Sequence, residues 1–210
     1  RYIRIDTILM SIQHDEGIDL EQFKQYVVEN IMKKVAKSFG LNTDFKVFFN
    51  PTGMFVIGGP TGDTGVTGRK IIVDTYGGTC EHGGGAFSGK DPTKVDRSAA
   101  YMARYIAKNL VAAGIANRLR VQLSYAIGVN EPLSINVRTY KTSQYSDDLI
   151  LSIVRKVFDC RPGMIIKHFN LTEPSFKYHE LTNYGHFGRP DLDLPWEKLD
   201  KVAEIKSLLK

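Results

Sequence analysis

The spacing of hydrophobic positions switches along this chain between the period of a strand and the period of a helix. Residues 20–37 carry apolar side chains at helical spacing, with Asp19 in front as an N-cap and Gly40 behind as a stop. Residues 5–12 instead alternate apolar and polar side chains, as a half-buried strand does. The same patterns predict strands at 45–49, 70–76, 121–127, 134–139 and, more weakly, 164–169, and helices at 92–113, 147–158 and 196–209.

These elements mix strands and helices without a regular strand–helix–strand alternation. That order favours an α+β fold, with mixed or antiparallel sheets and helices on one face. The succession strand–helix–strand does occur more than once, which allows a weak internal repeat.

Composition narrows the class of protein. The chain has 210 residues, 42% hydrophobic and 24% charged, and a net charge of +5. The positive charge gathers near glycine-rich turns rather than in a stripe with exposed aromatics, which disfavours nucleic acid as a partner. No apolar run approaches the roughly 20 residues of a membrane span.

The two cysteines, Cys80 and Cys160, are far apart in sequence, which suggests neither a zinc site nor a disulfide. Their number and spacing fit a reducing cytoplasm. The chain opens at Arg1 in a strand-like segment, so we expect it to be a piece of a longer protein, cut at its N-terminal side.

Two glycine-rich segments, 58–70 and 82–97, carry the candidate chemistry. Glycine lets the backbone approach a ligand and present successive N–H groups. Paired basic residues end each segment, and carboxylates that could hold Mg²⁺ or an ammonium group lie among them. A polyphosphate bound with a metal requires this combination.

The second segment begins like a Walker A phosphate loop but departs from it. Gly84, Gly89 and Lys90 fit its first seven positions, whereas Asp91 stands where a Ser or Thr should be. Pro92 then removes an N–H that a phosphate cradle would use. A phosphate-loop kinase is therefore disfavoured, while a different phosphate cradle is not.

Lys90 and Lys94 lie near the start of the predicted helix 92–113, where each cation opposes the helix dipole at roughly 0.3–1 kcal/mol. An anion bound there would offset that cost, which favours anion binding over solvated surface lysines. Asp63 and Asp96 also have structural interpretations: Asp63 as a turn former, and Asp96 as a helix-face ion pair or a capping partner. Arg69 and Lys70 fit a solvated strand edge equally well, and His82 could touch a ligand or brace its loop.

Several longer motifs resemble the S-adenosylmethionine synthetase (methionine adenosyltransferase) family. The most specific is the run His-Gly-Gly-Gly-Ala-Phe-Ser-Gly-Lys-Asp-Pro at 82–92. Segments 55–60, 62–63, 67–78, 94–101, 124–128 and 184–189 match as well, so the similarity covers essentially the whole chain. The resemblance implies that ATP and L-methionine are joined, with methionine sulfur attacking ribose C5′. Triphosphate leaves and is hydrolysed to phosphate and diphosphate, with Mg²⁺ and K⁺ assisting.

The resemblance also implies roles for individual residues. The expected catalytic residues are those of the triphosphate clamp, Arg69, Lys70, Lys90 and Lys94. Phe55 resembles the residue that stacks on adenine, and Ala86 would meet the nucleotide through its backbone. The implied ATP-binding set is Met54, Phe55, Asp63, Arg69, Lys70, Ala86 and Lys90; the methionine-binding set is Asp63, Lys94 and Ile127; the metal-associated carboxylate is Asp96.

The family's organisation implies three pseudo-repeated α+β domains built from non-contiguous segments. Here 1–58 would finish the N-terminal domain, 59–98 would form part of the central one, and 99–210 would make most of the C-terminal one. A homodimer or dimer of dimers is implied, with active sites at the subunit interface. The family's N-terminal active-site portion is absent, so we expect this chain alone to be inactive. The alternative is a non-catalytic fragment or regulatory partner that binds nucleotide or an enzyme subunit.

Overall fold

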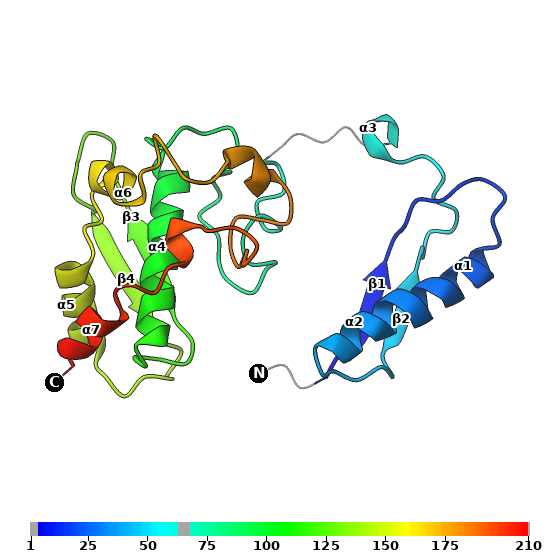
Figure 1. Ribbon diagram of the computed structural model, residues 1–210, viewed down its shortest axis with the longest axis horizontal. Helices are drawn as coiled ribbons and strands as arrows, with labels where there is room; N and C mark the ends of the chain where they lie inside the picture. The colour runs from blue at the N-terminus through cyan, green and yellow to red at the C-terminus, as the bar shows by residue number, and fades with distance from the viewer. Residues whose placement is uncertain (1–3, 63–67, 210) are drawn as a thin grey trace. The chain divides into compact units, whose positions relative to one another are not determined.

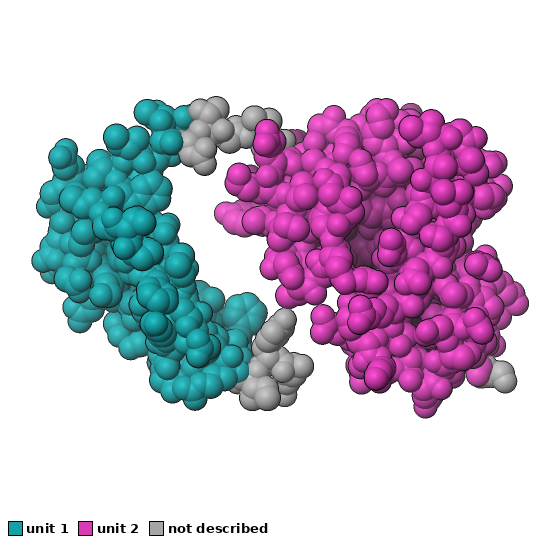
Figure 2. Space-filling view, turned by 180° about the vertical axis from the view of Figure 1, so that it is seen from behind, with its two compact units in different colours: residues 1–65 teal, residues 66–210 magenta. Residues whose placement is uncertain are grey.

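The chain separates into two units, Arg1–Gly65 and Val66–Lys210, coloured teal and magenta in Figure 2. The structure is a computed structural model that describes residues 4–62 and 68–209. Each unit has its own hydrophobic core. None of the helices in the described ranges combines the length and apolar character that a membrane span requires.

The first unit is a parallel pair of strands joined by one long helical crossover (Figure 1). Strand β1 (Thr7–Met10) pairs with β2 (Lys46–Phe49). The crossover consists of α1 (Leu20–Val27), a π turn η1 (Val28–Met32) and α2 (Lys33–Ser38). A short helix, α3 (Gly59–Gly62), follows.

The π turn decides which helical residues face the core. Val27 and Met32, five residues apart, are both buried, and Ala36 is buried one α-turn later. A regular α-helix would rotate the fifth residue off that face, and the wider π turn brings it back. Ile31 and Val35, which the helical pattern aligns with Val27, are 38% and 52% exposed instead.

The second unit is built around one long helix, α4 (Val95–Ala112). Figure 1 shows α4 flanked by the antiparallel pair β3–β4 and by shorter helices. These elements are β3 (Arg120–Ser124), β4 (Ser134–Arg138), α5 (Asp147–Val157), α6 (Pro162–Phe169), η2 (Tyr178–Thr182), η3 (Pro195–Glu197) and α7 (Val202–Ser207).

The core of this unit forms on α4 because its apolar residues recur every three or four positions. Met102, Ile106 and Leu110 are fully buried on one stripe, and Tyr101 lies beside them. The indole of Trp196 in η3 stacks on the Tyr101 ring, with centroids 3.8 Å apart, and ties the C-terminal segment to α4.

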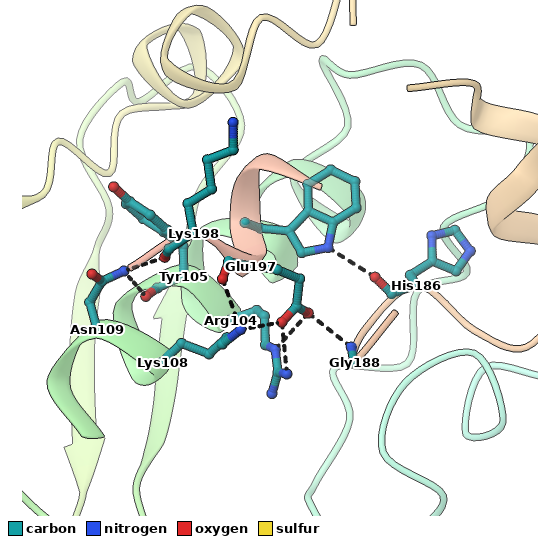
Figure 3. Close-up of polar contacts among 9 residues, drawn as sticks. Arg104, Tyr105, Lys108, Asn109, His186, Gly188, Glu197 and Lys198 are labelled. Atoms are coloured by element: carbon teal, nitrogen blue, oxygen red, sulfur yellow. Dashed lines mark hydrogen bonds and ion pairs between the residues drawn. The ribbon is translucent and has the colours of Figure 1, made fainter. Parts of the chain in front are cut away.

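A polar cluster fixes the same C-terminal segment to α4 (Figure 3). The Glu197 carboxylate accepts two 3.0 Å hydrogen bonds from the Arg104 guanidinium and one of 2.7 Å from Lys108 Nζ. It also accepts a hydrogen bond of 2.9 Å from the Gly188 N–H. Asn109 adds neutral hydrogen bonds, donating to the Lys198 carbonyl and accepting from the Lys201 N–H.

Much of the predicted secondary structure is confirmed. Asp19 caps α1 by accepting hydrogen bonds from two backbone N–H groups, and Ser146 caps α5 by accepting one from the Leu149 N–H. Gly40 and Gly114 follow the ends of α2 and α4 with positive φ angles. The α+β class is confirmed too, with one parallel and one antiparallel strand pair among the described residues.

Two predicted strands are wrong. Residues 70–76 form consecutive turns, in which the Asp74 N–H donates to the Lys70 carbonyl and the Gly77 N–H to the Ile72 carbonyl. Residues 164–169 belong to α6, where Pro162 at the first turn and Asn170 in the left-handed conformation outweigh β-branched content.

Two helix boundaries also differ from the prediction. Asp91 caps a turn, accepting from the Thr93 N–H at 2.8 Å, so α4 begins at Val95 with Lys94 as its N-cap. The expected helix 196–209 is divided between η3 and α7. The structure has two units with a division at 65–66, and α4 runs through the expected domain boundary at residue 98.

Candidate functional site

The two glycine-rich segments meet in the second unit at Gly68. A Cβ added to Gly68 would lie 3.0 Å from the Ser88 carbonyl oxygen and 3.4 Å from the Ala86 Cβ. Gly68 also has a φ of +86°, which disfavours other residues. Arg69 therefore leaves the first segment directly beside the second.

The side chains of Arg69 and Lys70 are exposed. Neither forms an ion pair with any residue in 4–62 or 68–209. Their charges are therefore available to an external anion, which is what a phosphate-binding role requires.

Lys90 and Asp96, predicted separately for phosphate and metal, form an ion pair of 2.8 Å between Nζ and Oδ2. Both side chains are partly exposed, at 30% and 51%. The Gly85 backbone packs against the same carboxylate: a Cβ there would lie 2.6 Å from Asp96 Oδ1 and closer still to its Cγ. The absence of a side chain at Gly85 thus lets the glycine-rich backbone reach the carboxylate.

Lys94 lies at the N-cap of α4, and its Nζ is 3.3 Å from Asp91 Oδ2. Hydrogen bonds from the Thr93 side chain and backbone are the main reason that the pKa of Asp91 falls to about 2. Asp91 is therefore ionised at neutral pH and partly offsets the charge of Lys94. Of the four cations predicted to form the clamp, Lys90 and Lys94 have carboxylate partners, whereas Arg69 and Lys70 have none among the described residues.

A buried polar chain lies behind this surface, and sequence reasoning assigned it no role. Arg97 donates from Nε to the Tyr101 hydroxyl at 3.0 Å, and that hydroxyl is 2.8 Å from His186 Nδ1. His186 Nε2 is 3.3 Å from Ser88 Oγ in the second glycine-rich segment. His186 stands in the Tyr184–Arg189 motif, which signalled its importance but not its partner 98 residues away.

Phe55, predicted to stack on adenine, and Met54, predicted to bind ATP, lie in the first unit. The Phe55 N–H donates to His14 Nε2 at 3.0 Å, and the His14 N–H donates to the Phe55 carbonyl at 2.9 Å. His14 is buried, so it holds the backbone of Phe55 at a defined place in that unit. Met54 beside it is 55% exposed. Sequence reasoning assigned no role to His14.

Two further residues were predicted to bind methionine, Ile127 and Asp63. Ile127 is fully exposed in the turn after β3. Asp63 lies outside the described residues. Within residues 4–62 and 68–209, no group of three His, Cys, Asp or Glu side chains could hold a metal ion by itself.

A second basic cluster differs from the clamp because each of its three cations already has a carboxylate partner. Arg104, Lys108 and Arg189 line a cavity of about 390 Å³ together with Glu197. Glu197 pairs with the first two, and Asp191 lies 2.6 Å from Arg189. Burial tends to raise the pKa of Glu197, but hydrogen bonds from Arg104 and Lys108 outweigh it and lower the pKa overall.

The sequence matches two models of one protein family. The model described as "S-adenosylmethionine synthetase, C-terminal domain" matches residues 57–198. The model described as "S-adenosylmethionine synthetase, central domain" matches residues 1–55. The two matched ranges meet at 55–57, whereas the two units of the structure divide at 65–66. The expected domains were 1–58, 59–98 and 99–210, with the first taken as part of an N-terminal domain.

Curated relatives named S-adenosylmethionine synthase are similar over nearly the whole chain. Those from Mycoplasma mycoides and Mycoplasmopsis pulmonis are each 58% identical over 207 residues, which is 99% of this chain. The one from Clostridium botulinum is 57% identical over 206 residues, or 98% of this chain. The matches cover 52%, 54% and 52% of these relatives, so the chain spans about half their length. With both units matched, the chain belongs to the S-adenosylmethionine synthetase family.

Proposed function

We propose that this chain forms part of the active site of a methionine adenosyltransferase. The reaction converts ATP, L-methionine and water into S-adenosyl-L-methionine, phosphate and diphosphate. The observation that carries the proposal is the meeting of two glycine-rich segments, which brings Arg69 beside Ala86 and Ser88 while Lys90 and Asp96 pair close by. Membership of the family supports the same activity.

The clamp cations act on the leaving group. Triphosphate departs readily only when its developing charge is stabilised, and fixed cations provide that stabilisation without reorganising during the reaction. Arg69 and Lys70 have no carboxylate partner among the described residues, so they can contact phosphate oxygens without breaking an ion pair. Lys90 pairs with Asp96 and Lys94 with Asp91, and each ammonium keeps a further N–H donor for a phosphate oxygen.

Asp96 fits the role of one ligand to Mg²⁺. Mg²⁺ sites in phosphate chemistry commonly use one or two carboxylates, with water and substrate oxygens completing the shell. The exposed Asp96 carboxylate beside the Gly85 backbone fits such a site, and a site built from protein ligands alone is not required. When bound, Mg²⁺ would neutralise charge on the phosphate oxygens. We assign no residue of this chain to K⁺.

The substrates would be oriented by the other predicted residues. Phe55 would stack on adenine, Met54 would bind ATP, and the Ala86 backbone would contact the nucleotide. Asp63, Lys94 and Ile127 would bind methionine. Thioether sulfur is already a good nucleophile, so alignment with ribose C5′ suffices and the sulfur attack needs no general base.

The proposal includes assembly and location. We propose a homodimer or dimer of dimers in the cytoplasm, with active sites completed at the subunit interface. Light scattering on the polypeptide in its full encoded length would test assembly, and a monomer that retains full activity would contradict an interface site.

The activity test uses the polypeptide in its full encoded length with ATP, methionine, Mg²⁺ and K⁺. We expect S-adenosylmethionine and orthophosphate, and Lys90→Ala should lower kcat by about a hundredfold or more, as loss of a transition-state charge contact does. Lys167→Ala, an exposed lysine of α6, is the matched control and should leave the rate unchanged. The 210-residue chain alone should be inactive. ATP binding without product by the full-length protein would instead support the non-catalytic alternative.

A further inference from the structure

The buried polar chain links the Arg97 guanidinium to the second glycine-rich segment through three hydrogen bonds. It runs from Arg97 through Tyr101 and His186 to Ser88, over 3.0, 2.8 and 3.3 Å. The first three residues are at most 5% exposed, whereas Ser88 is partly exposed. The buried polar chain therefore starts in the core and ends at the surface where the two glycine-rich segments meet.

Each hydrogen bond of the buried polar chain has one possible donor, and every donor lies on the Arg97 side of its acceptor. A guanidinium N–H can only donate, so the Tyr101 oxygen accepts from Arg97. The Tyr101 hydrogen then needs an acceptor, and His186 Nδ1 is the one that the described residues offer. Burial first, then the charges of Arg97 and Arg189, lower the pKa of His186 to about 4, so its ring is neutral and carries one N–H.

Because Nδ1 accepts from Tyr101, the single N–H of His186 is at Nε2, which faces Ser88 Oγ. Ser88 Oγ is thus an acceptor toward the interior. Its own hydrogen has no acceptor among the residues in 4–62 and 68–209 and is free to be donated outward.

The backbone around Ser88 is held from the same core. Arg97 also donates from Nη1 to the Lys90 carbonyl at 2.6 Å. The Phe87 ring, 3% exposed, packs edge-on against the His186 and Tyr101 rings, with centroids 5.2 and 5.6 Å away. Ser88 is therefore fixed between two anchored neighbours, close to Gly68 and the start of the Arg69–Lys70 pair.

We propose that Ser88 is a further phosphate-binding residue, whose hydroxyl donates to an oxygen of the triphosphate chain, and that His186 is the positioning residue that directs it. This inference rests on the proposed function for the identity of the anion. Hydrogen-bond chains polarise their members, so a cation at the Arg97 end makes the Ser88 hydroxyl a better donor to an anion. The 3.3 Å link should shorten when phosphate draws on the Ser88 hydrogen.

The test measures binding of inorganic triphosphate with Mg²⁺ to the full-length protein by calorimetry. A hydrogen bond to a charged group is worth about 1.5–3 kcal/mol, so Ser88→Ala should weaken binding roughly 10- to 100-fold. Unchanged affinity in this variant would overturn the proposal.

Two substitutions of His186 separate positioning from general support of the fold. His186→Gln places an amide N–H near the Nε2 position and should retain most of the triphosphate affinity. His186→Asn reaches only the Nδ1 position and should weaken binding about as much as Ser88→Ala. In the Ser88→Ala background, His186→Asn should cause no further loss; additive losses would mean that His186 acts apart from Ser88 and would overturn its positioning role.

The same experiment distinguishes this inference from the proposed function. Triphosphate binding that weakens in Ser88→Ala, in a protein that makes no S-adenosylmethionine, would refute the activity and keep the Ser88 site. Normal synthesis with unchanged triphosphate affinity in Ser88→Ala would refute the Ser88 site alone.

Discussion

Glu197→Gln should be among the most destabilising single substitutions of a polar residue in the second unit. The substitution keeps the shape of the side chain but removes the charge that Arg104 and Lys108 share. One oxygen becomes an NH₂ group, which faces either those cations or the Gly188 N–H as a donor against a donor. Two partly buried cations are thus left with a weakened partner.

The magnitude follows from burial. Breaking a buried ion pair by removing one partner costs about 3–5 kcal/mol. Here the side chains are 14% exposed for Glu197, 21% for Arg104 and 28% for Lys108, so water can take over part of the solvation. We therefore expect about 2–3 kcal/mol, which lowers the Tm of a unit of this size by roughly 5–10 °C.

Thermal and urea unfolding, followed by circular dichroism, would measure this loss. Glu204→Gln is the control, because its ion pair with Lys201 is exposed and should contribute less than about 0.5 kcal/mol. The folded-state pKa of Glu197 lies below its ordinary 4.5, so the Glu197 contribution is present above that pH. It is lost as the pH falls through the folded-state pKa, and the gap between wild type and variant should close there. A Tm within 2 °C of wild type at pH 7 would refute the reasoning.

Three further predictions concern other parts of the second unit. His186 has a pKa of about 4 in the folded state against an ordinary 6.5, so the unfolded state binds more protons between those pH values. Lowering the pH from 7 to 5 should therefore reduce the free energy of unfolding of the wild type by about 2 kcal/mol more than that of His186→Gln. Urea unfolding that shows the same pH dependence in both proteins would contradict this. Gly85→Ala should displace the Asp96 carboxylate and raise the Mg²⁺ concentration for half-maximal activity about tenfold, with the Tm nearly unchanged. Gly163→Ala is the control, because a Cβ there meets open space and should change neither quantity. Equal Mg²⁺ requirements in the two variants would contradict a role of the Gly85–Asp96 contact in Mg²⁺ use. Burial raises the pKa of the Cys160 thiol to about 12, so Ellman's reagent at pH 8 should label Cys160 only after unfolding. The partly exposed Cys80 is replaced by Ser for this measurement, and rapid labelling of Cys160 in the native protein would contradict the prediction.

The elements that could be predicted from sequence are those whose signals are local. Asp19 and Ser146 cap helices through their own side chains, and the apolar spacing of α4 and α5 is set within each helix. The run at 70–76 misled because β-branched residues favour a strand only when another strand pairs with it, and here the backbone bonds to itself. The π turn at 28–32 could not be predicted from the sequence, because its effect is visible only in which helical side chains are buried in the folded unit.

The candidate site also has one part that the local sequence predicts and another part that only the fold brings together. The glycine pattern and the basic residues placed Lys90 and Asp96 in one segment, and a spacing of six residues kept them within reach of each other. The approach of Gly68 to Ser88 joins residues twenty apart, and only the fold brings them together. His186 had no predicted role because its partners, Tyr101 and Ser88, lie on elements 85 and 98 residues away.

The stacking of Trp196 on Tyr101 gives the protein a built-in optical reporter. Trp196 is the single tryptophan of the chain, is fully buried, and donates its indole N–H to the His186 carbonyl. Fluorescence excited at wavelengths that only tryptophan absorbs therefore reports the second unit alone, while circular dichroism reports both. If the two signals change at different denaturant concentrations, the units unfold independently, and the offset measures the difference in their stability without any label.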